Sequence, residues 1–332
     1  MSRADEVYRL EWAALSIVLA PIAVFIASNV LFNSFGAGGI HLSGHISPDS
    51  WPPGGSNESA ARLYVLIALI AFGSTAAATV LLFLNDFLRT YGFTIRVQLI
   101  VGMAGGILLA WIWQHCSPQA GPPEKFMGRH FVELTEGWAR MEGCGPSGEA
   151  QYGPWCYFQQ LRRLVVYAYT AIPFLIAILI AGTGSCLAAP VADDKDLQRI
   201  AVDRQQRRLQ AYVICAAALL AMGVLLELAW TRWPLSALGP VELAGYETYV
   251  DALAMFFGVT YSVMIASYAI PVAVLLQMRR AALSLAPEEA GERPGLLDNG
   301  LIDALGKILT VLAPALAGAV PVVLDLIKHG SS

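Results

Sequence analysis

Histidine and cysteine are the side chains of this sequence that could take part in the most kinds of chemistry, because both bind metal ions and cysteine is also a nucleophile. The chain contains five of each. His41 and His45 are four residues apart, but glycine, serine and proline surround them, so no helix would present both to one ion. The cysteines form no C-x-x-C pair and show no zinc spacing. The sequence therefore predicts no metal centre and no cofactor.

Three cysteines belong to one polar stretch, residues 116–160. Cys144 and Cys156 enclose a short segment rich in glycine and proline. The topology derived below places this stretch outside the membrane, where thiols can oxidise. We predict a disulfide between Cys144 and Cys156, with Cys116 either buried or paired with another chain.

Ionisable side chains are almost absent from the apolar blocks of the sequence. Glu227, late in the fifth block, comes nearest to the interior of one. A charge in hydrocarbon is costly and usually marks an ion or proton pathway. Glu227 is thus either a binding carboxylate near an outer gate, or a charge at the membrane surface that pairs with Arg232 or reaches water.

Uncharged polar side chains recur inside the apolar blocks, several of them close to a proline. Such groups either line a path for a neutral solute or form hydrogen bonds between helices, worth about 0.6 kcal/mol on average. With Glu227, the residues of this candidate polar pathway are Asn29, Thr75, Tyr169, Tyr261 and Tyr268.

Gly102 and Gly106 form a G-x-x-x-G pattern, which lets two helix backbones approach closely. The contact lies either within one bundle or between two copies of the chain. Neither glycine offers chemistry. General acid–base catalysis needs positioned titratable groups, and because few are available we consider an enzyme the least favoured class.

The elements that would position these residues are membrane helices. Charged residues make up 14% of the chain, against about 25% in soluble domains, and the mean hydropathy is +0.57. The apolar blocks have the length of about 20 residues that crosses a bilayer, where a helix satisfies its own backbone groups. We predict an all-α polytopic bundle with about six spans, at 12–32, 63–84, 97–115, 164–189, 211–230 and 252–278.

Lysine and arginine flank these spans unevenly. They are more frequent in the segments that lie inside if the N-terminal residues 1–11 are inside, above all in the short loop 195–208. Cationic flanks favour the cytoplasm. We therefore expect a plasma-membrane protein, such as one of the bacterial inner membrane, with both termini in the cytoplasm.

Three segments lie outside the six spans. The loop 116–160 is predicted to form an outer, cysteine-containing domain. In the inner loop, Asp193 and Asp194 are candidate N-caps of a helix that continues into the fifth span. Residues 279–332 are predicted to form a cytoplasmic linker and an amphipathic tail of kinked short helices, on the membrane surface or against the bundle. A seventh span over 302–328 is the alternative, although its uncharged core is short.

Two functional hypotheses remain ahead of an enzyme. The first is a non-enzymatic component of a membrane assembly, acting as a scaffold, a sensor or an oligomeric pore. The second is a transporter or channel for a neutral or weakly polar solute. The expected partners are the lipid bilayer, another copy of the chain, or a protein docked on the tail. A net charge of −4 without a basic face argues against nucleic acid.

Overall fold

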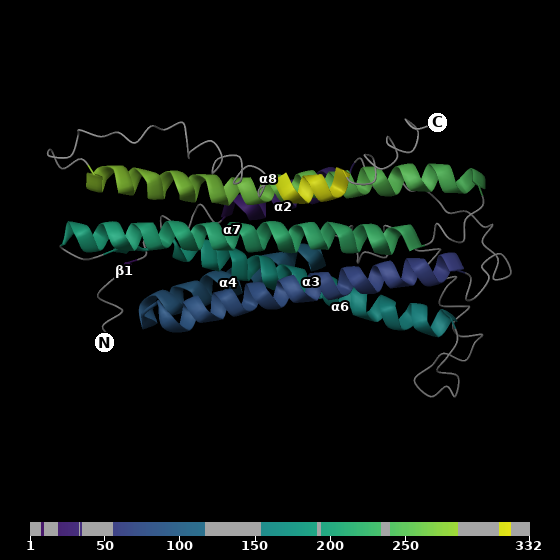
Figure 1. The fold of residues 1–332 in the computed structure, drawn as a ribbon, viewed down its shortest axis with the longest axis horizontal. Helices are drawn as coiled ribbons and strands as arrows, with labels where there is room; N and C mark the ends of the chain where they lie inside the picture. The colour runs from purple at the N-terminus through teal and green to yellow at the C-terminus, as the bar shows by residue number, and fades with distance from the viewer. Residues whose placement is uncertain are drawn as a thin grey trace.

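The computed structural model is a bundle of long helices that run in a common direction (Figure 1). It describes residues 8–9, 19–32, 34, 56–116, 154–190, 194–233, 240–284 and 312–319. The helices with their bounds are α2 (Leu19–Leu31), α3 (Ser56–Arg89), α4 (Phe93–Cys116), α6 (Pro154–Ser185), α7 (Lys195–Arg232) and α8 (Pro240–Ser284).

Four of these helices are long and apolar enough to cross a membrane, which indicates a membrane protein and confirms the helical fold class. Large aliphatic side chains point away from the bundle, as in α3, where Ile67 and Ile70 are 62% and 69% exposed. Apolar surface of this kind is stable against lipid and not against water. The candidate spans are Ser59–Arg89, Gln160–Ser185, Lys195–Arg232 and Tyr246–Leu283, and shorter apolar stretches are Leu19–Ser28 and Phe93–Gly105.

α7 is the helix around which the others pack. It contacts α8 on one side and α3 and α6 on the other. Its predicted N-cap is confirmed, because Asp194 Oδ1 accepts a hydrogen bond of 2.8 Å from the backbone N–H of Asp196. A cap of this type stabilises a helix by about 1 kcal/mol. The helix then continues without a break from the inner loop through the predicted fifth span.

A short antiparallel pairing of two strands was not expected from the sequence. β1 (Tyr8–Arg9) pairs with β2 (Ala189–Pro190), and Tyr8 lies opposite Pro190. Residues 8–9 therefore lie at the end of the bundle where α6 ends and α7 begins.

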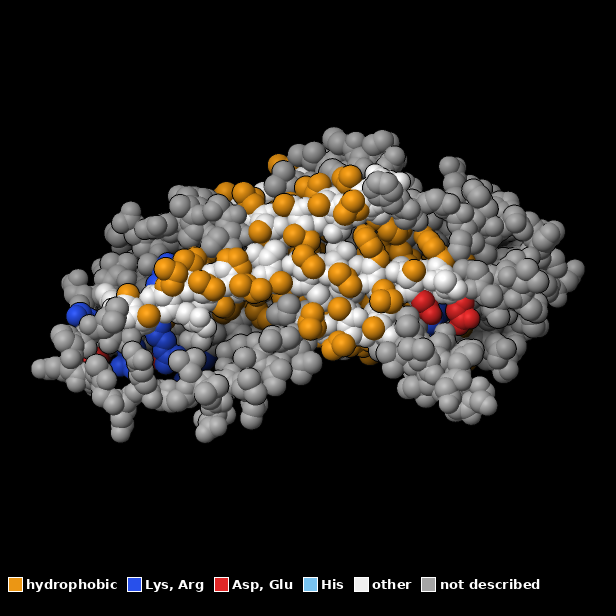
Figure 2. Space-filling model, turned by 90° about the horizontal axis from the view of Figure 1, so that it is seen from above, with side chains coloured by type: hydrophobic (Ala, Val, Ile, Leu, Met, Phe, Trp, Pro, Cys, Tyr) orange, Lys and Arg blue, Asp and Glu red, His pale blue; other side chains and the backbone are white. Residues whose placement is uncertain are grey.

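Two ion pairs lie at opposite ends of α7. Arg208 pairs with Asp86 of α3, and Arg232 pairs with Asp251 of α8. About 24 residues, or about 36 Å of helix, separate the two arginines, close to the ~30 Å of a hydrocarbon core. In Figure 2 hydrophobic side chains cover the middle of the face, cationic ones gather toward one end and acidic ones toward the other. We name these ends the Arg208 end and the Arg232 end.

Residues 312–319 form a short helix that packs against α8. Gly258 faces the carbonyl oxygen of Pro314, with no room for a Cβ atom between them, and Gly318 similarly faces the carbonyl of Ala254. Residue numbers rise along this segment as they fall along α8, so the two helices are antiparallel.

A hydrogen bond fixes the register of this contact. The backbone N–H of Ala315 donates to Ser262 Oγ at 3.1 Å. Ser262, Gly258 and Ala254 are spaced four residues apart and form one small-residue stripe on α8. Ala254 is close to Asp251 in sequence, so the segment lies along the half of α8 that begins at the Arg232 end. The rest of the predicted tail lies outside the described residues.

Close backbone contact predicts that a large side chain will displace this segment. In a background without native cysteines, Ser262→Cys and Ala315→Cys should form a disulfide under mild oxidation. Adding Gly258→Leu should abolish the crosslink, because its side chain would occupy the position of the Pro314 carbonyl. Gly73→Leu is the control, since nothing lies within 4 Å of a Cβ there. Equal crosslinking in both variants, measured by gel mobility, would contradict this packing.

Candidate functional site

Glu227 is a buried carboxyl in the half of α7 nearest the Arg232 end. Its residue is 6% exposed, and its Oε1 atom has no hydrogen-bond partner among the described residues. The ion pairs of the described part of the chain do not include it. A buried acid in this condition is unusual, because an unsatisfied polar group in a dry interior costs about 1–3 kcal/mol, and a charged one costs more.

Arg232 does not neutralise Glu227, contrary to one of the two expectations. Its Nη2 atom lies 2.6 Å from Asp251 Oδ1 instead. Five residues along a helix correspond to about 140° of rotation, so Glu227 and Arg232 face different sides of α7. The other expectation, a carboxylate that reaches water, is also not met, because Glu227 is buried.

Three tyrosines of α8, Tyr246, Tyr249 and Tyr261, lie within electrostatic range of the Glu227 carboxyl, and none of them forms a hydrogen bond with its Oε1 atom. The Tyr246 hydroxyl donates to the backbone carbonyl of Thr231 at 2.8 Å, so its proton is already engaged. The ion pair of Arg232 with Asp251 fixes the register of α7 and α8, which brings this group of side chains together. We call Glu227, Tyr249 and Tyr261 the carboxyl site.

The remaining residues of the predicted polar pathway do not all join this site. Thr75 donates to backbone carbonyls of its own helix, at 3.1 Å to Ala71 and 2.9 Å to Phe72. Tyr268 is 5% exposed in α8. The hydroxyl of Tyr169 in α6 is buried and has no partner among the described residues. The side chain of Asn29 lies outside the described residues.

Gly102 and Gly105 of α4 have no close neighbour within the described part of the chain. A Cβ atom added to Gly102 or to Gly105 would meet nothing within 4 Å. Gly106 lies in the same helix. Within the described residues, Gly102 therefore does not provide a close helix contact inside one bundle, and the contact between two copies stays a prediction.

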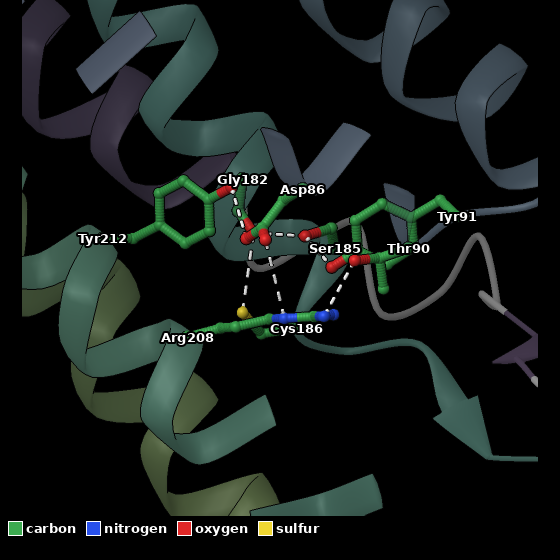
Figure 3. A network of polar contacts seen from close by, with 8 residues as sticks. All are labelled: Asp86, Thr90, Tyr91, Gly182, Ser185, Cys186, Arg208 and Tyr212. Carbon is green, nitrogen blue, oxygen red and sulfur yellow. Dashed lines mark hydrogen bonds and ion pairs between the residues drawn. The ribbon is translucent and has the colours of Figure 1, made fainter. Parts of the chain in front are cut away.

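A second polar group, at the Arg208 end, was missed by the sequence analysis (Figure 3). Arg208 Nε lies 3.7 Å from Asp86 Oδ1, and its Nη2 donates to Thr90 Oγ1 at 2.8 Å. The Tyr212 hydroxyl donates to Asp86 Oδ2 at 3.1 Å. Asp86 is 6% exposed. It lies just beyond the predicted second span, and the sequence analysis did not single it out.

The start of the α6–α7 connection is joined to the same group. The hydroxyls of Tyr91 and Ser185 are 2.7 Å apart, and Ser185 Oγ donates to the carbonyl of Gly182 at 2.5 Å. The Arg208 guanidinium lies 5.7 Å from the centre of the Tyr91 ring. Burial raises the pKa of the Tyr91 phenol, and the nearby Cys186 adds to this effect. Tyr91 therefore remains a neutral hydroxyl at physiological pH.

The connection itself is buried and tied down by long polar side chains. Cys186, Leu187 and Ala188 are all at most 1% exposed. Arg279 Nη1 donates to the Leu187 carbonyl at 2.8 Å, and Gln205 Nε2 donates to the Ala188 carbonyl. A fully buried Cys186 thiol is not accessible to a substrate. The group at the Arg208 end therefore holds helices together and offers no evident chemistry.

The described residues give little support for metal binding or for thiol chemistry. These contain no cluster of three or more metal-ligating side chains. Cys186 and Cys215 are free thiols. The predicted disulfide between Cys144 and Cys156 lies outside the residues whose side chains are described, as do His41 and His45.

No family model, curated protein or solved structure matches this chain. Its function therefore has to be inferred from its own residues.

The Arg208–Asp86 pair predicts a measurable stability difference between two ion pairs of α7. Arg208→Gln leaves Asp86 buried and unpaired, so it should destabilise the protein by about 1–3 kcal/mol, between the values typical of surface and of buried pairs. Arg280→Gln is the control, because Arg280 and Asp203 are 51% and 39% exposed, and should cost less than about 1 kcal/mol.

The measurement is the apparent unfolding temperature in detergent. The double variant Asp86→Asn with Arg208→Gln should recover part of the loss, since it removes the unpaired charge as well. Equal effects of the two single variants would contradict this interpretation.

Proposed function

We propose that this chain is a plasma-membrane protein that binds and moves a small solute, with Glu227 as the binding carboxyl. The observation that carries the proposal is the buried, unpartnered Oε1 atom of Glu227. An ionisable residue inside a membrane bundle is costly, and it is retained where it serves a substrate or ion pathway.

The depth of Glu227 supports a site inside the membrane. Glu227 precedes Arg232 by five residues, about 7–8 Å of helix. It lies on the inner side of the Arg232–Asp251 level and well away from the Arg208 level. A solute that enters from the Arg232 end would therefore have a shorter distance along the bundle to Glu227 than one that enters from the Arg208 end.

The chemistry of the site favours a solute with a positive charge or a hydrogen-bond donor. A carboxylate accepts hydrogen bonds and attracts cations, and the tyrosine rings of the carboxyl site add attraction for a cation over their faces. This differs from the neutral or weakly polar solute expected from the sequence. Tyr261 stacks on Phe257, with ring centres 5.9 Å apart, which gives one wall of the site an aromatic face.

The proposed membrane arrangement adds two shorter helices to the long candidate spans. α2 and α4 complete six spans, with the Arg208 end in the cytoplasm because cationic side chains gather there. The loop 116–160 is then outside. The antiparallel contact of residues 312–319 with α8 supports a membrane-embedded segment that packs against the bundle and runs toward the Arg232 end.

An assembly role is the second candidate, and the outward face of Gly102 and Gly105 favours it. Small residues exposed on a membrane helix allow close approach of another helix. The two roles are compatible, since many solute-conducting proteins are homo-oligomers. Enzymatic activity remains the least favoured class, because the buried titratable groups are not arranged as a nucleophile with a base.

The carboxyl site predicts that solute movement depends on Glu227. Purified protein in liposomes should conduct protons or the bilayer-impermeant organic cation tetraethylammonium. Glu227→Gln should reduce this flux by at least about tenfold, because the amide retains shape but loses the charge. Glu247→Gln is the control in the same bundle, at a partly exposed position. Flux can be followed with an internal pH dye and a cation-selective electrode. Unchanged flux in Glu227→Gln would remove the carboxyl as the binding group.

The outward glycines predict an effect on self-association. Gly102→Leu together with Gly105→Leu should shift the protein from oligomer to monomer in native mass spectrometry, because the leucine side chains prevent close helix approach. Gly73→Leu, at another exposed glycine, should not. A wild-type chain that is monomeric at all detergent concentrations would contradict the assembly role.

A further inference from the structure

Three exposed arginines at the Arg208 end make no polar contact among the described residues that would stabilise the fold. Arg89 of α3 and Arg204 and Arg207 of α7 are exposed and form no ion pair or hydrogen bond within the described part of the chain. Neighbouring arginines differ from them in this respect. Arg208 pairs with Asp86, and Arg280 pairs with Asp203. Arg96 donates to the backbone carbonyls of Tyr91 and Leu88.

The free arginines lie on the parts of α3 and α7 that are next to each other at the Arg208 end. Arg204 precedes Arg208 by one helical turn on the same face. The Arg208 guanidinium contacts Thr90, the residue directly after Arg89. The positive charges from two helices therefore lie around one junction, and Figure 2 shows Lys and Arg side chains gathered toward this end of the molecule. We call Arg89, Arg204 and Arg207 the arginine cluster.

The depth of the arginine cluster matches the headgroup layer of a bilayer. Arg207 and Arg204 lie about 1.5 Å and about 6 Å beyond Arg208 along the helix. The polar layer on each side of the hydrocarbon is about 5–8 Å thick. Arg199 lies about 13 Å beyond Arg208, outside that layer.

Exposed apolar side chains adjoin the cluster on the membrane side. Leu84 and Leu88 of α3 are 43% and 60% exposed, and Phe93 at the start of α4 is 74% exposed. A ligand at this junction would thus meet cations at one end and apolar side chains at the other. A phospholipid with a negative headgroup has this pattern, whereas a soluble acidic peptide lacks the acyl chains that would cover the apolar side chains.

We propose that the arginine cluster binds the phosphate-bearing headgroup of an anionic phospholipid, whose acyl chains lie along the exposed side chains of α3 and α4. Clusters of cationic residues at the membrane surface attract anionic lipids, and each added residue strengthens the binding. The guanidinium fork suits a phosphate group in particular. The site is separate from the carboxyl site, so it does not depend on the function proposed for Glu227.

The test measures lipid binding to the full chain in detergent by native mass spectrometry, with phosphatidylglycerol and phosphatidylcholine as probes. The wild-type protein should prefer phosphatidylglycerol. Arg204→Gln with Arg207→Gln should reduce that preference by at least about tenfold, and rising salt should weaken it in the wild type. Both positions are exposed, and a single size-exclusion peak will verify that the variant is folded.

Two controls make the result specific. Arg199→Gln removes the same charge from an exposed position of the same helix beyond the headgroup layer, and it should leave the preference intact. Glu227→Gln should also leave it intact. Equal loss in Arg199→Gln and in the double variant would overturn the proposal in favour of diffuse attraction. Tighter binding of a heptaglutamate peptide than of phosphatidylglycerol would overturn it in favour of an acidic protein partner.

Discussion

The position of α7 depends on two ion pairs, and the other features of the bundle depend on the position of α7. Arg208 joins it to α3 through Asp86, and Arg232 joins it to α8 through Asp251. Between them lie about 36 Å of helix with few polar contacts. Because packing between apolar helices in lipid is not directional, polar contacts at the two ends determine which residues of α7 and α8 face each other. Glu227 meets the α8 tyrosines for this reason.

Small residues determine a different part of the architecture. On α8, Ala254 and Gly258 allow the backbone of residues 312–319 to approach closely, and Gly182 of α6 leaves room for the Tyr212 ring. At each of these positions, a neighbouring backbone or ring occupies the space that a larger side chain would fill. The close approach increases dispersion contacts, which matter because lipid provides no hydrophobic driving force between helices. The bundle thus combines polar contacts that define register with small residues that define distance.

The sequence was sufficient for the class of fold but not for the site. Apolar blocks of membrane length and the Asp194 cap are local features, and both predictions agree with the structure. The role of Asp86 is not local, because its partners Arg208 and Tyr212 are more than 100 residues away. The burial of Glu227 likewise depends on α8. The position of Glu227 late in the fifth apolar block indicated that this residue is unusual, but it suggested a location near water. The small residues at every fourth position of α8, Ala254, Gly258 and Ser262, were a signal for the contact with residues 312–319 that the sequence analysis did not use.

The buried connection between α6 and α7 has a consequence for how this chain tolerates change. Most surface loops accept insertions because their backbone is hydrated. Here the carbonyls of Leu187 and Ala188 are bound by Arg279 and Gln205, two side chains from other parts of the fold. An extra residue at this point would leave those donors without acceptors and would rotate the start of α7. The number of residues in this connection is therefore constrained by the fold, as the residue types inside a packed helix are. Epitope tags or fusion domains should be inserted elsewhere.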